Sequence, residues 1–258
     1  MAIAAGTLHV VEYNALVFRR LFRVSLTVSF FTPLFFLAAM GLGLGGLINR
    51  SSGGVDGVSY IAFLAPGLIA AATMQTAAVE CMYPILAKIM WDRTYEAALA
   101  TPITVADILR GEVIWLTIRM FIAAAMFWIV MFVFGVGHSL EALGAILAAI
   151  LTGLAFATPI MAFTATRKND SGFAATNRFV IIPLYLLAGA FFPIAKLPLA
   201  LQVVAWATPL AHGIALSRGF VLGNLNLSEA ALHTTVLLAY FVGGLVLARA
   251  QLTKRLSK

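Results

Sequence analysis

The stretch that decides the fold class is residues 140–164, LEALGAILAAILTGLAFATPIMAFT. Glu141 is its single charged residue. A helix that crosses a bilayer needs about 20 mostly apolar residues, because each residue rises about 1.5 Å and the hydrocarbon core is about 30 Å thick. We therefore predict a transmembrane helix here, and the rest of the chain was searched for segments of the same kind.

Composition points the same way for the whole chain. Of its 258 residues, 62% are hydrophobic and 10% are charged, whereas soluble domains carry about 25% charged residues. There are too few polar side chains to cover a water-facing surface, so a lipid-facing exterior is expected. We predict an all-α membrane protein, one domain over 1–258, with six transmembrane helices. Their ranges are 24–48, 60–86, 108–134, 140–164, 177–192 and 230–247.

The basic residues predict the orientation. The net charge of +7 does not indicate nucleic-acid binding, because the basic residues are spread over short loops. One side of the six predicted helices holds thirteen Lys and Arg residues, and the other side holds Arg50, Lys196 and Arg218. By the positive-inside rule, both termini lie in the cytoplasm. The thirteen are Arg19, Arg20, Arg23, Lys88, Arg93, Arg110, Arg167, Lys168, Arg178, Arg249, Lys254, Arg255 and Lys258.

Two segments flank the predicted helices in unusual ways. Residues 7–23 have an apolar stripe and off-stripe charges, which favours an interfacial helix; the alternative is a plain cytoplasmic tail. Residues 191–223 are apolar but are broken by prolines and glycines, which favours short re-entrant helices on the outer side. Pro183 predicts a kink in the fifth transmembrane helix.

Local signals add smaller expectations. Thr104 and Asp107 have the spacing of a capping box that begins the third transmembrane helix. Gly41 and Gly45 form a G-x-x-x-G pair, which permits close helix packing. The single cysteine, Cys81, excludes an internal disulfide and a cysteine-based metal cluster. No Lys or Arg precedes Arg19, which is atypical of a secretory signal peptide.

Sequence motifs for chemistry are missing. The chain has no G-x-x-x-x-G-K-[ST], H-E-x-x-H or G-x-S-x-G motif, and its four histidines show no metal-ligand spacing. We therefore expect no catalytic residue, no metal and no ATP site in this chain. His138 and His212 are expected in outer loops.

Three charges fall inside predicted transmembrane helices: Glu80, Glu112 and Arg119. Charges in hydrocarbon are costly, so they are usually paired or functional. An ion pair between Glu80 and Arg119 is the favoured interpretation, and a solvated position along a substrate path is the alternative. A proton relay is disfavoured, because no chain of acids crosses the membrane.

The cytoplasmic loop over residues 88–102 mixes charge with aromatic residues. Trp91, Tyr95 and Leu99 are spaced by four, so on a helix they share one stripe. An apolar stripe on a loop helix indicates a protein partner, and an interfacial helix held by its aromatic residues is the alternative. Both can hold at once.

Five blocks of sequence resemble the permeases of type-2 ABC exporters, in particular the nodulation protein J-like branch that exports lipooligosaccharides. They are Leu64–Gly67, Asp92–Pro102, Asp107–Glu112, Leu187–Pro198 and Trp206–His212. Drug-exporting relatives share the same blocks. The resemblance covers nearly the whole chain and implies a bacterial inner-membrane protein.

This resemblance implies a half-transporter that dimerises, as a homodimer, and pairs with two copies of a separate ATPase that binds ATP and Mg²⁺. It implies that residues 91–99 form the coupling helix, 7–23 an elbow helix, and 191–223 the helices that close the exit. The residues expected to contact the ATPase are Trp91, Asp92, Arg93, Tyr95, Glu96 and Leu99.

The functional hypothesis is ATP-driven export of an amphipathic substrate, either a glycolipid, a lipooligosaccharide or a hydrophobic drug. Aromatic and thioether side chains of the first transmembrane helix are expected to line the transport path; the alternative is that they face lipid. These residues are Phe30, Phe31, Phe35, Phe36 and Met40. Two other classes remain open: a membrane-embedded lipid-modifying enzyme and an ion-coupled secondary transporter. The acids available to such an enzyme lack the spacing of lipid phosphotransferases.

Overall fold

Helices make up most of the chain that the computed structural model describes, residues 2–256. The first run consists of α1 (Ala2–Leu37), the π-helical η1 (Ala38–Leu44) and α2 (Gly45–Ser52). Next come α3 (Tyr60–Leu86), the π-helical η2 (Ala87–Trp91), α4 (Thr94–Leu99) and α5 (Val105–Val133). They are followed by η3 (Glu141–Leu143), α6 (Gly144–Ala165), α7 (Phe173–Thr176), the π-helical η4 (Asn177–Ile181) and α8 (Ile182–Leu187). The last elements are η5 (Ile194–Lys196), α9 (Leu199–Trp206), α10 (Pro209–Leu222) and α11 (Leu227–Leu256).

Five helical runs of the described chain are long and apolar enough to cross a membrane, and this number becomes six if the bent pair α9–α10 counts as one. The five runs are Ala5–Ser52, Tyr60–Trp91, Val105–Val133, Glu141–Ala165 and Leu227–Leu256. The all-α, multi-pass prediction is therefore confirmed. The two helices of the α9–α10 pair meet at 82° inside the region predicted to be re-entrant.

The fifth predicted helix differs from the prediction. Its helical run covers Phe173–Leu187 rather than 177–192, and at about 1.5 Å per residue it spans only about 22 Å. Pro183 has no N–H to donate to the preceding turn, and the π-helical η4 lies directly before it. The helix ends before Gly189, whose φ of +90° lies in the left-handed region. The segment is therefore a short helix, and its bounds lie about four residues earlier than predicted.

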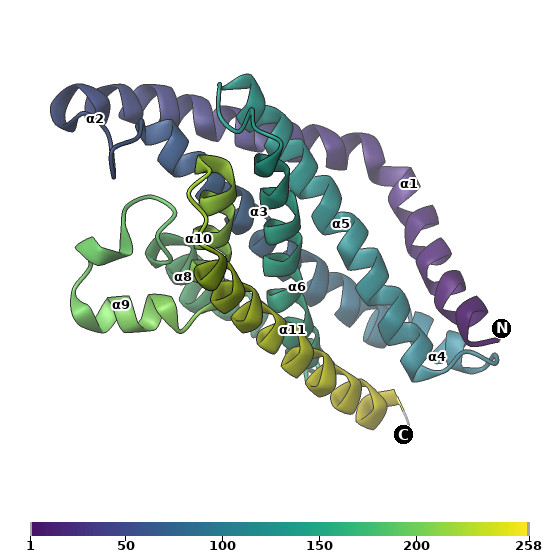
Figure 1. Cartoon of the computed structure of the whole chain (residues 1–258). Coiled ribbons are helices and arrows are strands. Elements are labelled where there is room, and N and C mark those ends of the chain that lie inside the picture. The colour runs from purple at the N-terminus through teal and green to yellow at the C-terminus, as the bar shows by residue number, and fades with distance from the viewer. Residues whose placement is uncertain (1, 257–258) are drawn as a thin grey trace.

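The expected boundary between an interfacial helix and the first transmembrane helix is also absent, because the chain stays helical from 2 to 52. Figure 1 shows α1 running beside α5 from the N-terminus and then turning toward α2. Thr7, Val10 and Asn14 face the protein and are buried. Leu8 and Phe22, from the predicted apolar stripe, remain exposed. Phe18, another residue of that stripe, packs edge-on against Trp115 of α5, so only part of the stripe is free to face lipid.

Several glycines leave no room for a side chain between packed helices. A side chain at Gly41 would meet Ile61 of α3 at 2.7 Å, and one at Gly111 of α5 would meet Val10 of α1 at 2.6 Å. Small residues let backbones approach in membranes, where packing replaces the hydrophobic effect as the driving force. Gly41 thus has the packing role that the G-x-x-x-G spacing predicted.

The core of the molecule lies around α3 and α6, which are far more buried than α1, α5 or α11. Side-chain hydroxyls link the packed helices: Thr73 of α3 donates to the Ala149 carbonyl at 2.7 Å, and Thr158 of α6 donates to the Phe241 carbonyl at 2.9 Å. The outer faces of α1 and α11 expose many Leu, Val and Phe side chains. These faces suit lipid or a second protein.

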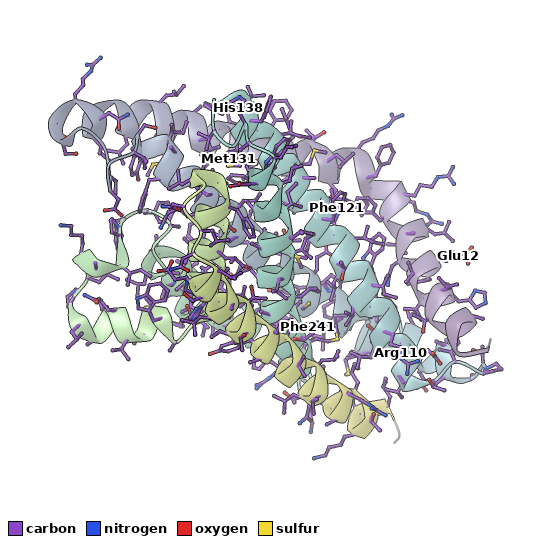
Figure 2. The ribbon with its side chains drawn as sticks, in the orientation of Figure 1. Glu12, Arg110, Phe121, Met131, His138 and Phe241 are labelled. Atoms are coloured by element: carbon purple, nitrogen blue, oxygen red, sulfur yellow. The ribbon has the colours of Figure 1, made fainter. Side chains whose placement is uncertain are left out.

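The two ends of the helical body differ. Figure 1 shows both termini and α4 at one end, here called the terminal end, and α2 and α9 at the other, here called the far end. Figure 2 places Glu12 and Arg110 toward the terminal end, and Met131 and His138 toward the far end. At the terminal end, α5 begins with the predicted capping box, since Thr104 and Asp107 exchange hydrogen bonds.

Candidate functional site

The segment predicted to contact an ATPase, residues 91–99, is not one continuous helix with an apolar stripe. Trp91 ends η2, and α4 begins only at Thr94. Arg93 stands between them with φ of +50°, a left-handed conformation that interrupts the helix. Helical spacing therefore fails across the break: Trp91 is 59% exposed, whereas Tyr95 is only 3% exposed. The predicted shared stripe of Trp91, Tyr95 and Leu99 was wrong.

The exposed side of this segment forms a small polar and aromatic surface, here called the coupling surface, which consists of Trp91, Asp92, Arg93 and Glu96. All four residues are exposed. The Arg93 Nε lies 3.9 Å from the Glu96 Oε2, a pair too open to water to stabilise the fold much. Leu99 is half-buried and packs against the core.

The inner side of α4 rests on a buried polar group, here called the Lys88 cluster, made of Asn14, Lys88, Tyr95 and Glu112. The Lys88 Nζ donates to the Glu112 Oε1 at 2.7 Å and to the Asn14 Oδ1 at 2.6 Å. The side chain of Glu112 is 2% exposed and that of Lys88 is 13% exposed. A cavity of about 250 Å³ borders Lys88, Tyr95 and Glu112. The cluster thus joins α1, η2, α4 and α5 at one point.

Tyr95 is the cluster member that belongs to α4. Burial raises the pKa of its hydroxyl well above the usual value, and the nearby Glu112 carboxylate adds to the increase. The buried Tyr95 side chain therefore remains neutral at physiological pH.

The sequence prediction missed two members of the Lys88 cluster. Lys88 was assigned to a loop, although it lies on the continuation of α3 after residue 86. Asn14 was not singled out, although Thr7, Val10 and Asn14 share one helical face. A polar residue repeated along one face of an apolar helix was the available signal that this face packs against protein.

Farther along α5, the structure forms the predicted ion pair. The Arg119 Nη2 lies 2.7 Å from the Glu80 Oε1, and its Nε donates to the same oxygen at 2.9 Å. The Arg119 Nη1 also donates to the Ser25 hydroxyl at 3.0 Å, and the guanidinium lies over the Phe18 ring. Arg119 therefore joins α1, α3 and α5. Glu112 takes Lys88 as its partner instead.

This ion pair borders a cavity of about 280 Å³ between α1, α3, α5 and α8, here called the membrane cavity. Polar groups of Gln75, Thr76, Glu80 and Arg119 line part of it, and the other walls are mainly apolar. Such a mixture fits an amphipathic guest better than an inorganic ion.

The aromatic residues predicted for the path separate into two groups. Phe36 lines the membrane cavity and contacts the Phe191 ring. Phe31 and Phe35 stack on each other at the exposed surface of α1. Phe30 and Met40 are half-buried outside the cavity lining. Of the five residues predicted for the path, only Phe36 borders the cavity.

Of the two histidines predicted in outer loops, His138 lies in the loop between α5 and η3, whereas His212 departs from the expectation. His212 belongs to α10 rather than to a loop, and it is buried. Its Nδ1 lies 2.8 Å from the Nδ1 of His233 in α11, and its Nε2 donates to the Trp206 carbonyl at 2.9 Å. Within residues 2–256, no group of three His, Cys, Asp or Glu side chains is arranged to hold a metal ion.

Comparison with known proteins agrees with this architecture. The profile of the ABC-2 type transporter family matches residues 10–222, which include every helix from α3 to α10. The chain belongs to the ABC-2 type transporter family. As a member of this family it is a multi-pass membrane subunit of a transporter.

Curated relatives make the assignment more specific. The chain is similar to Nodulation protein J of Rhizobium leguminosarum bv. viciae, with 36% identity over 245 residues, covering 95% of this chain and 93% of the relative. Nodulation protein J of Rhizobium meliloti strain 1021 is 36% identical over 243 residues, covering 94% and 91%. Nodulation protein J of Bradyrhizobium diazoefficiens is 34% identical over 229 residues, covering 89% and 86%. The chain is therefore an ABC-2 permease of the Nodulation protein J type.

Proposed function

We propose that this chain is the permease subunit of an ATP-driven exporter in a bacterial inner membrane, with its terminal end in the cytoplasm. Two copies of the chain would form the passage, and two copies of a separate ABC ATPase would bind ATP and Mg²⁺. The substrate is an amphipathic glycolipid of the lipooligosaccharide class. Family membership supports the transport role, and the geometry of the terminal end supports the coupling to a partner.

The observation that carries the coupling is the two-sided construction of α4. Its outer side exposes the coupling surface at the same end as the termini, and its inner side carries the buried Tyr95. A partner that docks on Trp91 and Glu96 can move α4 only by also moving the Lys88 cluster. Motion would then reach α1 through Asn14 and α5 through Glu112.

The membrane cavity supports the choice of substrate class. Its polar groups gather around the Glu80–Arg119 pair, and aromatic and aliphatic side chains complete the walls. A glycolipid presents sugar hydroxyls and an acyl chain, so it can satisfy both kinds of wall at once. The Phe31 and Phe35 rings, exposed on α1, provide a surface for the acyl chain or for a second protomer.

The test is co-purification of the permease with its co-encoded ABC ATPase. We expect the double variant Trp91→Ala, Glu96→Ala to lose the ATPase while remaining folded, because both side chains are exposed. Leu140→Ala, directly before η3 and 87% exposed, is the matched control and should retain the ATPase. Full retention by the double variant would contradict docking at this surface.

A further inference from the structure

A second cavity lies at the far end, where the loop before α3 meets α9 and α10. It has a volume of about 260 Å³ and is bordered by Asp56, Gln202, Trp206 and Arg218, among others. We name it the α9–α10 cavity. This volume falls just below the range of about 300–1,000 Å³ found for drug-sized ligands. It suits a single ring-sized unit rather than a complete lipid.

Arg218 gives the cavity a fixed hydrogen-bond donor. Its Nε and Nη2 donate to the Phe63 carbonyl at 3.3 and 3.2 Å, and its Nη2 also donates to the Gly189 carbonyl at 2.9 Å. The guanidinium lies 3.8 Å above the centre of the Phe63 ring. Within the described chain, no acid lies within ion-pair distance of Arg218, and its Nη1 makes no hydrogen bond. Because these contacts hold one side of the planar Arg218 guanidinium, its remaining N–H donors point in a defined direction.

Acceptors are available in the same cavity. The Gln202 Nε2 donates to the Leu197 carbonyl at 2.8 Å, which holds the amide in place and leaves its oxygen as an acceptor. The Asp56 carboxylate also borders the cavity and accepts no hydrogen bond from any residue within 2–256. Positive and negative groups thus face the same space without forming a pair.

An aromatic platform completes the arrangement. The Trp206 ring is 42% exposed and stacks on the His233 ring with an interplanar angle of 6°. The Trp206 carbonyl is held by the His212 ring at 2.9 Å, so the end of α9 has a defined position. A tryptophan presents an apolar face next to a polar edge, a combination that suits the faces of a sugar ring.

We propose that the α9–α10 cavity binds one sugar ring of the exported molecule, with Arg218 donating to its hydroxyl groups, Asp56 and Gln202 accepting from them, and Trp206 against its face. A free anion is the less suitable occupant, because the Asp56 carboxylate would repel it. A lone apolar group is also unsuitable, because it would leave the Nη1 of the half-buried Arg218 without an acceptor. The role of the cavity in transport rests on the proposed function, whereas binding to the permease alone does not.

The experiment measures binding without an ATPase. The full chain is purified without sugar-based detergent, placed in lipid nanodiscs, and titrated with methyl glycosides of glucose, mannose and N-acetylglucosamine. Saturation-transfer NMR reports contact with each glycoside, and ³¹P NMR with inorganic phosphate tests the anion. We expect saturation of at least one glycoside and no phosphate binding.

Asp56→Gly is the decisive variant, since glycine tolerates the φ of +50° at this position and the change removes the short side chain with its carboxylate. Loss of a charged hydrogen bond should weaken glycoside binding about tenfold. Asp170→Gly, in an exposed loop outside the cavity, should leave binding unchanged. Absence of glycoside binding, equal binding by both variants, or binding of phosphate alone would each overturn the proposal. Failure of ATPase docking would leave these results unaffected, so the two proposals fail separately.

Discussion

Removing one partner of the Lys88–Glu112 pair should destabilise the protein strongly. Lys88→Met keeps the length of the side chain and deletes the ammonium that contacts a carboxylate only 2% exposed. At the observed 2.7 Å, the attraction is about 6 kcal/mol with an effective dielectric constant of about 20. Desolvation of both ions offsets much of this attraction. A buried charge left without its partner nevertheless costs about 3–5 kcal/mol.

The companion variants separate the pair from its surroundings. Glu112→Gln alone should also destabilise, because it leaves the Lys88 ammonium with only the Asn14 oxygen. The double variant, Lys88→Met with Glu112→Gln, removes both charges and should be more stable than Lys88→Met alone. We expect a coupling energy of at least about 2 kcal/mol between the two positions.

The assay is equilibrium unfolding of the purified chain in mixed micelles, followed by circular dichroism as sodium dodecyl sulfate replaces the mild detergent. Arg93→Met is the matched control, since its pair with Glu96 is exposed and 3.9 Å long; it should remain within about 0.5 kcal/mol of wild type. Additive effects of the two cluster substitutions, or a Lys88→Met variant as stable as the control, would refute the reasoning.

Three further predictions concern other parts of the molecule. Glu80→Gln should leave Arg119 without a charged partner in the membrane cavity and reduce substrate-stimulated ATP hydrolysis at least about tenfold. Co-purification of the ATPase should persist, since the cavity lies away from α4. Unchanged stimulation would count against a role of the cavity in substrate binding. Gly111→Ala places a methyl 2.6 Å from the Val10 Cβ and should cost about 1–3 kcal/mol of unfolding free energy. This cost should shrink in a Val10→Gly background, which lacks that Cβ; an unchanged cost would mean that the two helices do not touch there. Because the pKa of Tyr95 is raised in the folded protein, stability should fall as pH rises above about 10, where the unfolded hydroxyl ionises but the buried one does not. Tyr95→Phe should reduce this loss of stability at alkaline pH, measured by melting at a series of pH values. An identical profile for the variant would contradict the burial of Tyr95.

Hydropathy and local chemistry were enough to predict the parts of the fold that depend on them. The second transmembrane helix was predicted at 60–86, and α3 has these bounds. The capping box at Thr104 and the pair between Glu80 and Arg119 were also predicted, since each depends on short spacing or on the cost of an isolated charge. These features follow from rules that act on a few residues at a time.

Features that depend on a break in the backbone or on contacts among several helices could not be predicted from the sequence. The left-handed Arg93 turned Tyr95 inward and separated it from Trp91, although helical spacing favoured one stripe. Likewise, nothing in the spacing of Asn14, Lys88 and Glu112 indicated that Lys88 contacts the other two, because these contacts need the folded arrangement of three segments. Sequence patterns identified the important segment but not its inner and outer sides.

The central claim is that this chain provides the passage while a separate ATPase supplies the energy. The most direct measurement is movement of a fluorescent glycolipid across the membrane of proteoliposomes that hold the permease with or without its co-encoded ATPase. Movement should require the ATPase, ATP and Mg²⁺ together, and should be lost in the Trp91→Ala, Glu96→Ala variant. Full movement by the permease alone, at an equal rate with and without ATP, would contradict the account.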